Sequence, residues 1–207
     1  MKYLDLGPYV RSEAQGVPDF ILERSVREAT IDFCVETDVY RPEPEKVNVS
    51  AGISEYELTI PAGTELNHII DIFRDKDRLT PVSYARLLEI TGDETSRGLP
   101  TKYSQRDNTV FYLAPLPATA ETLSVLYSLK PSASSSSIPD TVGKEYRETL
   151  VHGALYRLQM MPNQPWSNIG QAQNNKILCD KRKTEIMRQV RYGYAGAALT
   201  VRSRGFF

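Results

Sequence analysis

Two long helical patterns between residues 138 and 194 constrain this fold more than any other stretch of the sequence. In the first, apolar side chains recur every three or four positions, as in a helix with one buried face: Val142, Tyr146, Leu150, Ala154, Leu158 and Met161. Pro162 and Pro165 then prevent this helix from continuing. Asp140 and Ser167 are residue types that cap helix N-termini, and we expect each to cap one of the two helices.

A third helix is predicted near the N-terminus, beginning at Val17-Pro18-Asp19. Proline is tolerated in a first helical turn because its missing N–H has no partner there. The apolar face of this helix consists of Leu22, Val26, Ala29 and Phe33. The helix should end before Pro42 and Pro44, because a residue that precedes proline disfavours the helical conformation.

The stretch from residue 47 to residue 130 changes to short alternating or β-branched runs, which are typical of strands. These runs lie at residues 55–60, 68–73, 110–113 and 122–129, and turn signals rich in glycine, proline and aspartate separate them. The pattern predicts an antiparallel sheet or small sandwich inserted between the first helix and the final pair. Residues 84–90 suit either a short helix or a strand, and both alternatives stay open.

The predicted fold class is therefore α+β. An N-terminal helix and two long C-terminal helices pack together, a central antiparallel β-sheet or sandwich is inserted between them, and a C-terminal arm extends from the body. The corresponding divisions are residues 1–45, 46–131, 132–194 and 195–207. A chain of 207 residues suits one domain or two small lobes that share a core. The serine-rich residues 132–137 are predicted to be a flexible linker or a loop that orders against a partner.

The charge is unevenly distributed, although the net charge is only -1. Residues after Pro162 carry eight basic and two acidic side chains, a net +6, so residues 1–162 carry -7. Such a chain can dock one end on an acidic surface, although solvated helix faces often show the same pattern.

No apolar run approaches the roughly 20 residues that a membrane span needs. Asp5, Pro8 and Glu13 make the N-terminus unlike a secretory signal.

The sequence contains no motif that indicates catalysis. It lacks a glycine-rich phosphate loop, a nucleophile elbow and a paired-histidine zinc motif. His68 and His152 are the two histidines, and both are expected to be structural. Cys34 and Cys179 fall on predicted helices, where we expect buried, reduced thiols of a cytosolic product. We therefore predict no catalytic residue, no metal site and no cofactor.

The C-terminal helical pair resembles the closing helices of the head-to-tail adaptor (connector) proteins of tailed phages, called tail tubular protein A-like in short-tailed phages. The resemblance rests on residues 150–158, Leu-Val-His-Gly-Ala-Leu-Tyr-Arg-Leu, on Met160-Met161-Pro162, and on Pro165-Trp166-Ser167-Asn168 with Ala172. Residues 126–131 and 138–140 resemble the strand and turn before those helices. The N-terminal helix also fits the family, and the middle of the chain fits by architecture alone.

The resemblance implies a ring of about twelve copies beneath the portal, which joins it to the tail nozzle or tail tube and lets DNA pass non-specifically. It implies a virion protein that assembles in the host cytoplasm, without membrane contact. Gly153 and Ala154 would allow close helix approach, and Trp166 would fill the interhelical corner. The candidate subunit-interface residues are basic on one side and acidic on the other: Lys181, Arg182, Lys183, Arg188 and Arg191, with Glu43, Glu45, Glu55 and Glu57.

The last residues form the predicted portal-binding arm, because their apolar surface has no partner nearby in the sequence. The arm residues expected to contact the portal are Leu199, Val201, Arg202, Arg204, Phe206 and Phe207. Folding of this tail onto its own subunit is the alternative. The free protein is expected to be monomeric until it meets the portal. The alternative function is a cytosolic nucleic-acid-binding protein that uses the basic C-terminal helix.

Overall fold

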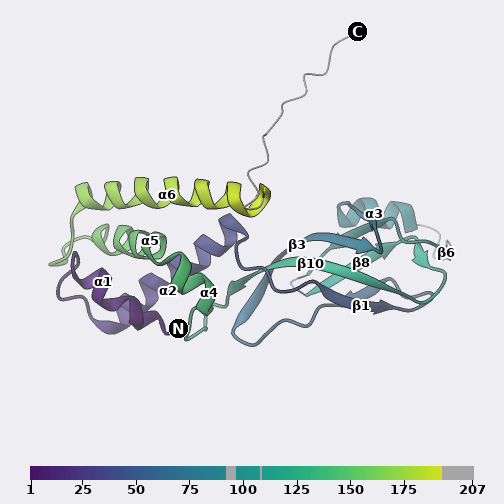
Figure 1. Cartoon of the computed structure of the whole chain (residues 1–207), viewed down its shortest axis with the longest axis horizontal. Helices are drawn as coiled ribbons and strands as arrows, with labels where there is room; N and C mark the ends of the chain where they lie inside the picture. The colour runs from purple at the N-terminus through teal and green to yellow at the C-terminus, as the bar shows by residue number, and fades with distance from the viewer. Residues whose placement is uncertain (92–96, 108, 193–207) are drawn as a thin grey trace, which may run out of the picture.

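The structure, a computed structural model, describes residues 1–91, 97–107 and 109–192, which form two lobes arranged end to end (Figure 1). One lobe is helical and brings together both ends of the described chain. Its elements are η1 (Tyr3–Leu6), a 3-10 turn, α1 (Gly7–Arg11), α2 (Asp19–Thr37), α4 (Asp140–Glu145), α5 (Arg147–Gln159) and α6 (Ile169–Tyr192). The second lobe is mostly β-structure, so the predicted α+β class is confirmed.

The described residues of the β lobe form ten strands and one helix. They are β1 (Glu45–Val49), β2 (Glu55–Glu57), β3 (Thr64–Arg74), β4 (Asp77–Arg78), β5 (Thr80–Pro81), α3 (Tyr84–Thr91), β6 (Arg97–Gly98), β7 (Lys102–Gln105), β8 (Val110–Ala114), β9 (Leu116–Pro117) and β10 (Glu121–Pro131). Two four-stranded sheets have the orders β1-β10-β3-β4 and β2-β8-β7-β5, and β6 pairs with β9. All four predicted strand runs fall within or overlap these strands.

Two strand pairs depart from the predicted antiparallel arrangement. β5 pairs with β7 in parallel, with Thr80 opposite Lys102, and β6 pairs with β9 in parallel. A parallel pair needs a long crossover between its strands, and the connection from β5 to β7 contains α3. The long central pair, β10 with β3, is antiparallel as expected.

Residues 84–90, which the sequence left between helix and strand, belong to α3. Leu87 is the buried residue of this helix, and α3 packs on β7 and β8. One buried side chain in eight is too weak a periodic signal to distinguish the two conformations. The neighbouring sheet surface therefore decided between them.

Each lobe has its own hydrophobic core. The helical core contains residues from both ends of the described chain, including Leu6, Phe33, Leu150 and Leu158. The β-lobe core is drawn from residues 49–129 and lies between the sheets, around side chains such as Phe111. Within the part of the chain that the structure describes, Tyr40 is the side chain that packs against both clusters. The two cores are therefore nearly independent.

The first C-terminal helix is not continuous, contrary to the sequence prediction. It breaks at Tyr146, where φ is -107°, into α4 and α5. Asp140 does not cap α4, because the N-cap position is Pro139 and Asp140 is already helical. The carboxylate of Asp140 instead accepts a hydrogen bond from the N-terminal amine at 2.5 Å. Because this amine lies 139 positions away in the sequence, the contact is tertiary.

Asn168, rather than the predicted Ser167, caps α6. Its Oδ1 accepts a hydrogen bond from the backbone N–H of Gln171 at 3.1 Å. The hydroxyl of Ser167 points back into the loop, where it donates to the carbonyl of Met161 and accepts from the N–H of Gln164. Both residue types are good caps, and the loop geometry selects the second.

The serine-rich residues 132–137 are not a flexible linker, because they pack against the N-terminal segment of their own chain. The hydroxyls of Ser135 and Tyr3 share a hydrogen bond of 2.6 Å, and Ser135 is buried. Lys2 forms a β-bridge with Ser137, and the N–H of Ile138 donates to the carbonyl of Met1. The partner of the serine-rich segment is therefore a part of the same chain that precedes the first predicted helix.

Candidate interaction surfaces

Helices α2, α5 and α6 meet at Gly153 of α5. A Cβ atom on this glycine would lie 3.1 Å from the Cβ of Ala29 on α2 and 3.5 Å from the Sγ of Cys179 on α6. Ala154 is fully buried beside it. Because cores are packed without spare volume, a larger residue at position 153 would push the helices apart. Trp166 lies in the loop between α5 and α6 and is 8% exposed within the same core.

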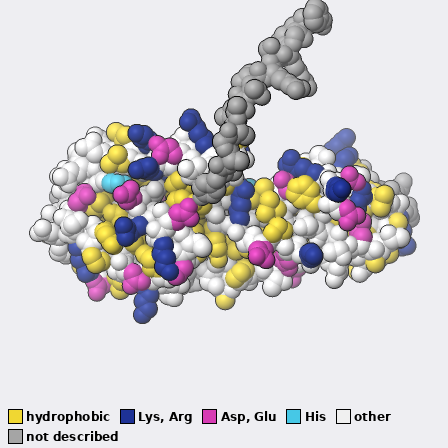
Figure 2. Space-filling model, in the orientation of Figure 1, with side chains coloured by type: hydrophobic (Ala, Val, Ile, Leu, Met, Phe, Trp, Pro, Cys, Tyr) yellow, Lys and Arg dark blue, Asp and Glu magenta, His cyan; other side chains and the backbone are white. Residues whose placement is uncertain are grey.

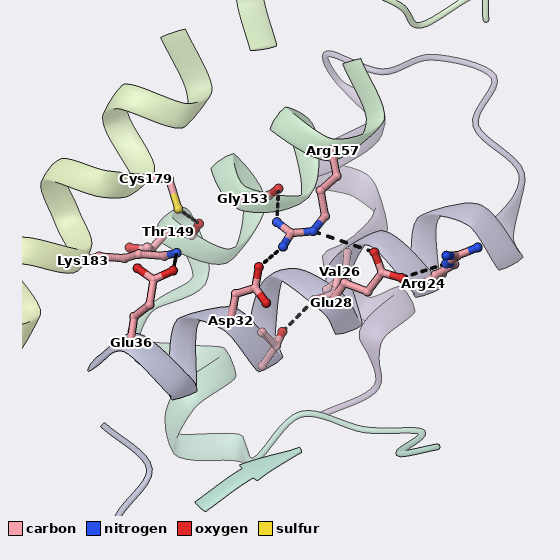
Figure 3. Close-up of polar contacts among 11 residues, drawn as sticks. Arg24, Val26, Glu28, Asp32, Glu36, Thr149, Gly153, Arg157, Cys179 and Lys183 are labelled. Carbon is pink, nitrogen blue, oxygen red and sulfur yellow. Dashed lines mark hydrogen bonds and ion pairs between the residues drawn. The ribbon is translucent and has the colours of Figure 1, made fainter. Parts of the chain in front are cut away.

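A set of charged contacts joins the exposed side of the same three helices (Figure 3). The guanidinium of Arg157 on α5 donates to the carboxylate of Asp32 on α2 and to the carbonyl of Gly153. The same guanidinium lies 3.8 Å from the carboxylate of Glu28. Arg24 approaches Glu28 from the other side at 2.8 Å. These charges belong to the internal architecture of the lobe and are not free for a partner.

Two of the predicted interface residues on α6 are engaged within their own chain. Lys183 is buried, and its Nζ donates to the carboxylate of Glu36 on α2 at 2.9 Å. Arg182 donates to Glu185 at 3.1 Å on the same helix, and it lies 3.8 Å from Glu148 on α5. Lys183 therefore ties α6 to α2.

The other three predicted basic residues, Lys181, Arg188 and Arg191, project into solvent. All three are exposed, and none forms an ion pair within residues 1–91, 97–107 and 109–192. At 100° per residue, Lys181 and Arg188 lie on the side of α6 opposite its buried face. They leave a basic outer face on the helix that forms one outer layer of the lobe (Figure 1).

The outer face of α6 also carries apolar side chains. Ile177 is 64% exposed, and Leu178 and Tyr192 are about half exposed. The buried face repeats every seven residues, at Ala172, Cys179 and Ile186. Because Ile177 and Leu178 fall outside this repeat, the sequence held the signal for an apolar outer face, and our sequence reasoning missed it. Figure 2 shows apolar and charged side chains interspersed over one face of the helical lobe.

The four predicted acidic residues lie on or next to the end strands of the two sheets. β1 and β2 are those end strands, and Glu45, Glu55 and Glu57 belong to them. The carboxylate of Glu45 accepts hydrogen bonds from the N–H of Thr59 at 3.2 Å and from the hydroxyl of Tyr127 at 3.3 Å. We call Glu43, Glu45, Glu55 and Glu57 the acidic edge. Burial is the main cause that raises the pKa of Tyr127 to about 12, and the nearby carboxylate of Glu45 is the next.

The acidic edge and the basic face of α6 lie on different lobes. In Figure 1, α6 forms one side of the helical lobe and β1 lies on the opposite side of the β lobe. The structure therefore does not bring the two predicted surfaces together within one copy of the chain.

The described surface carries several open grooves, and two of them involve the β lobe. One, of about 490 Å³, lies between the lobes and is lined by charged residues that include Arg41, Asp71 and Arg191. The other, of about 510 Å³, lies on the β lobe between α3 and β8, where Tyr84, Leu88 and Tyr112 line it. In the described ranges, no three His, Cys, Asp or Glu side chains are grouped so that they could hold a metal ion.

Both histidines make structural contacts, as expected. The Nδ1 of His152 lies 2.7 Å from the amide oxygen of Asn175, which connects α5 to α6. His68 lies on β3, 3.4 Å from the carboxylate of Asp38. Both cysteines are buried on helices, and burial raises the pKa of the Cys34 thiol to about 12. Such thiols are poor nucleophiles at neutral pH.

The predicted portal-binding arm, residues 195–207, lies outside the described residues. No helix among the residues that the structure describes is both long and apolar enough to cross a membrane.

Residues 1–202 match the model of the SU10 adaptor protein family, which consists of phage head–tail adaptors. The match spans both lobes. No curated protein matches the chain. The finer likeness to tail tubular protein A remains a prediction.

Proposed function

The chain belongs to the SU10 adaptor protein family, and we propose that it forms a ring of about twelve copies beneath the portal of a tailed phage. Family membership makes the protein a structural adaptor of the phage virion. In the proposal, the ring joins the portal to the tail nozzle or tube, and DNA passes through its channel without specific contacts. The family match across both lobes carries the proposal. Assembly takes place in the host cytoplasm.

A closed ring of identical chains needs two different complementary surfaces on each copy. The exposed cations Lys181, Arg188 and Arg191 supply one such surface, and the acidic edge supplies the other. Because the two surfaces lie on different lobes, the contact that satisfies both is one between neighbouring copies. Charge complementarity of this kind fixes the register of a contact and disfavours wrong partners.

Charge exchange tests this contact. Replacing Lys181, Arg188 and Arg191 by glutamate should abolish ring formation on the portal, and so should replacing Glu43, Glu55 and Glu57 by lysine. A chain that carries both sets of changes should assemble again, because the complementarity is restored. Light scattering and electron microscopy of the chain mixed with portal provide the readout.

A matched control keeps the number of reversed charges constant. Lys2, Lys76 and Arg86 are exposed basic residues that belong to neither surface. Their replacement by glutamate should leave the ring intact. Failure of the doubly exchanged chain to assemble, although it is folded, would refute this pairing without refuting the adaptor role.

The C-terminal arm is proposed to bind the portal. Arg202 and Arg204 would pair with carboxylates of the portal, while Phe206 and Phe207 fill an apolar groove on it. Deletion of residues 196–207 should leave both lobes folded and abolish portal binding in a pull-down assay. Undiminished binding by the shortened chain would contradict this role.

The free protein is proposed to be monomeric and to form its ring only on the portal. The serine-rich segment already packs on its own chain, so this expectation now depends on the arm alone. Static light scattering of the purified protein, with and without portal, measures the change in mass. A stable ring in the absence of portal would overturn the proposed order of assembly.

Nucleic-acid binding by α6 is the second candidate, and the exposed Lys181, Arg188 and Arg191 favour it. Phosphate contacts would make binding fall steeply with salt concentration. Against it, Ile177 and Leu178 occupy the same outer face, and apolar side chains gain little from a phosphate backbone. Salt-dependent binding of DNA by the isolated chain, lost in the Lys181→Glu, Arg188→Glu, Arg191→Glu variant, would support this alternative.

A further inference from the structure

The two lobes meet through polar groups, although each is held together by its own apolar core. Tyr40 is the single described side chain that both cores share. The groove between the lobes, about 490 Å³ in volume, further reduces apolar contact at this boundary. The angle between the lobes therefore depends on directional hydrogen bonds.

Asp38 stands at the centre of these contacts. It ends α2 in the left-handed conformation, with φ 53° and ψ 28°, and its N–H donates to the carbonyl of Cys34 at 3.0 Å. One carboxylate oxygen, Oδ1, accepts from the Nδ2 of Asn67 at 2.9 Å and from the Oγ of Ser128 at 2.8 Å. The Nδ1 of His68 lies 3.4 Å from the same oxygen. The residue that ends α2 thus bonds to both long central strands of the β lobe.

The pairing of those strands is interrupted at this point. Leu126 and Tyr127 of β10 pair with Asp71 and Ile69, so that Ile70 has no opposite residue. A second shift follows, because Ser128 pairs with His68 and Leu129 pairs with Leu66, which leaves Asn67 unmatched. A bulge turns a side chain away from its regular direction. Here the unmatched Asn67 reaches Asp38 and also donates to the carbonyl of Val35 on α2 at 3.3 Å.

Charged groups from α6, from β3 and β4 and from the chain around Asp38 surround the contact. Glu36 and Arg41 lie next to Asp38 in the sequence, Asp71 and Arg78 come from β3 and β4, and Arg191 comes from α6. Most of these side chains are already bonded: Glu36 to Lys183, Arg78 to Asp71, and Arg41 to the carbonyls of Asp38 and Val190. Among the charged side chains at this boundary, Asp38 is the one whose hydrogen bonds run from the end of α2 to β3 and β10, beside the backbone bond of 2.8 Å from the N–H of Leu129 to the carbonyl of Tyr40.

We propose that the carboxylate of Asp38, held by Asn67, His68 and Ser128, fixes the angle between the helical and β lobes. We call these four residues the Asp38 joint. The joint does not depend on the adaptor role. Removing the carboxylate should free the angle and leave both cores folded.

The test measures the distance between the lobes directly. Spin labels on Gln173→Cys in α6 and Lys46→Cys in β1 report it, since both positions are exposed. The native thiols interfere little, because burial raises the pKa of both Cys34 and Cys179 and removes them from solvent. We expect one narrow distance distribution for the otherwise unchanged chain.

Asp38→Gly should broaden that distribution and shift its mean. Glycine suits the left-handed position that ends α2, so the helix cap survives while the carboxylate is lost. Asn67→Ala removes one donor from the β-lobe side and should broaden the distribution less. Asp38→Asn keeps an acceptor oxygen, so its distance distribution should be the closest to that of the chain with Asp38.

The matched control is Asp75→Gly. Asp75 is exposed and also left-handed, with φ 50°, but it lies in the turn between β3 and β4, away from the boundary. It should leave the distance unchanged. Hydrogen exchange of α5 and β8 checks that both cores stay folded in every variant. An unchanged distance distribution in folded Asp38→Gly, or an equal change in Asp75→Gly, would overturn the proposal.

Discussion

The helical lobe and the β lobe are built from the chain in opposite ways. The β lobe uses one continuous stretch, residues 45–131, and strands from the two ends of that stretch pair with one another, as β1 does with β10. The helical lobe joins the two ends of the described chain through contacts such as Arg157 with Asp32, which are 125 positions apart, and Lys183 with Glu36, which are 147 apart. The β lobe therefore closes within a single segment of the chain, whereas the helical lobe depends on contacts between two segments that the whole β lobe separates in sequence.

Loss of a large core side chain should have the largest effect, and it tests whether the two lobes unfold separately. Phe33 and Phe111 are almost fully buried in different cores. Phe33→Ala or Phe111→Ala should each cost about 3–5 kcal/mol in the free energy of unfolding. Hydrogen exchange should increase chiefly in the lobe that carries the substitution. Equal exchange in both lobes would show that they unfold as one unit.

A smaller loss is expected where the three long helices meet. Gly153→Val places a branched side chain against Ala29 and Cys179, and overpacking of this kind costs about 1–3 kcal/mol. Gly170→Val is the matched control on α6. A Cβ atom there has only Asn168 nearby, so the change should stay within about 0.5 kcal/mol. Urea denaturation of both variants measures the difference, and similar losses would show that helix propensity, not packing, is responsible.

The long-range ion pair of the helical lobe should contribute less. Arg157→Met keeps most of the aliphatic stem but removes the contacts with Asp32 and Glu28, at a cost of about 1 kcal/mol. Arg24→Met breaks only an exposed pair within α2 and should destabilise the fold less than Arg157→Met does. Raising the salt concentration should partly reduce the stability loss caused by Arg157→Met and should almost abolish the loss caused by Arg24→Met, as denaturation at low and high salt would measure. No difference between the variants would mean that the link between α2 and α5 adds nothing.

The smallest effect concerns the contact between the N-terminus and α4. The hydrogen bond from Lys144 is the main cause that lowers the pKa of Asp140 to about 2, and the bond from the N-terminal amine is the next. Because the folded state binds the proton more weakly than the unfolded chain, this stabilisation is present above the ordinary pKa of 3.8 and is lost as pH falls toward 2. Denaturation midpoints from pH 5 to pH 2 should fall more steeply for the original chain than for Asp140→Asn. If the midpoints of the two chains fell in parallel with pH, the lowered pKa of Asp140 would not contribute to stability.

Helix and strand positions were largely predictable, because they depend on spacing. The apolar stripe Leu22, Val26, Ala29 and Phe33 is buried as expected, and the β-branched runs lie in strands. The helix break at Tyr146 and the capping of α6 by Asn168 were not predictable. Both depend on contacts between neighbouring segments. The sequence was equally compatible with a helix that continues through Tyr146 and with a cap at Ser167.

The candidate surfaces were only partly predictable. The sequence identified the basic character of α6, but it did not distinguish the exposed Arg188 from the buried Lys183. Five residues separate the two, which places them on different sides of the helix. The position of α2, which the sequence did not give, assigns Lys183 to Glu36.

The sequence by itself determined the elements, the apolar faces and, through the match over residues 1–202, the adaptor family. These properties depend on residue type and spacing along the chain. Only the tertiary structure decided which charges remain available to a partner and where the lobes join. Those choices depend on distances between groups far apart in sequence, as when Asn67 and Ser128 meet the carboxylate of Asp38.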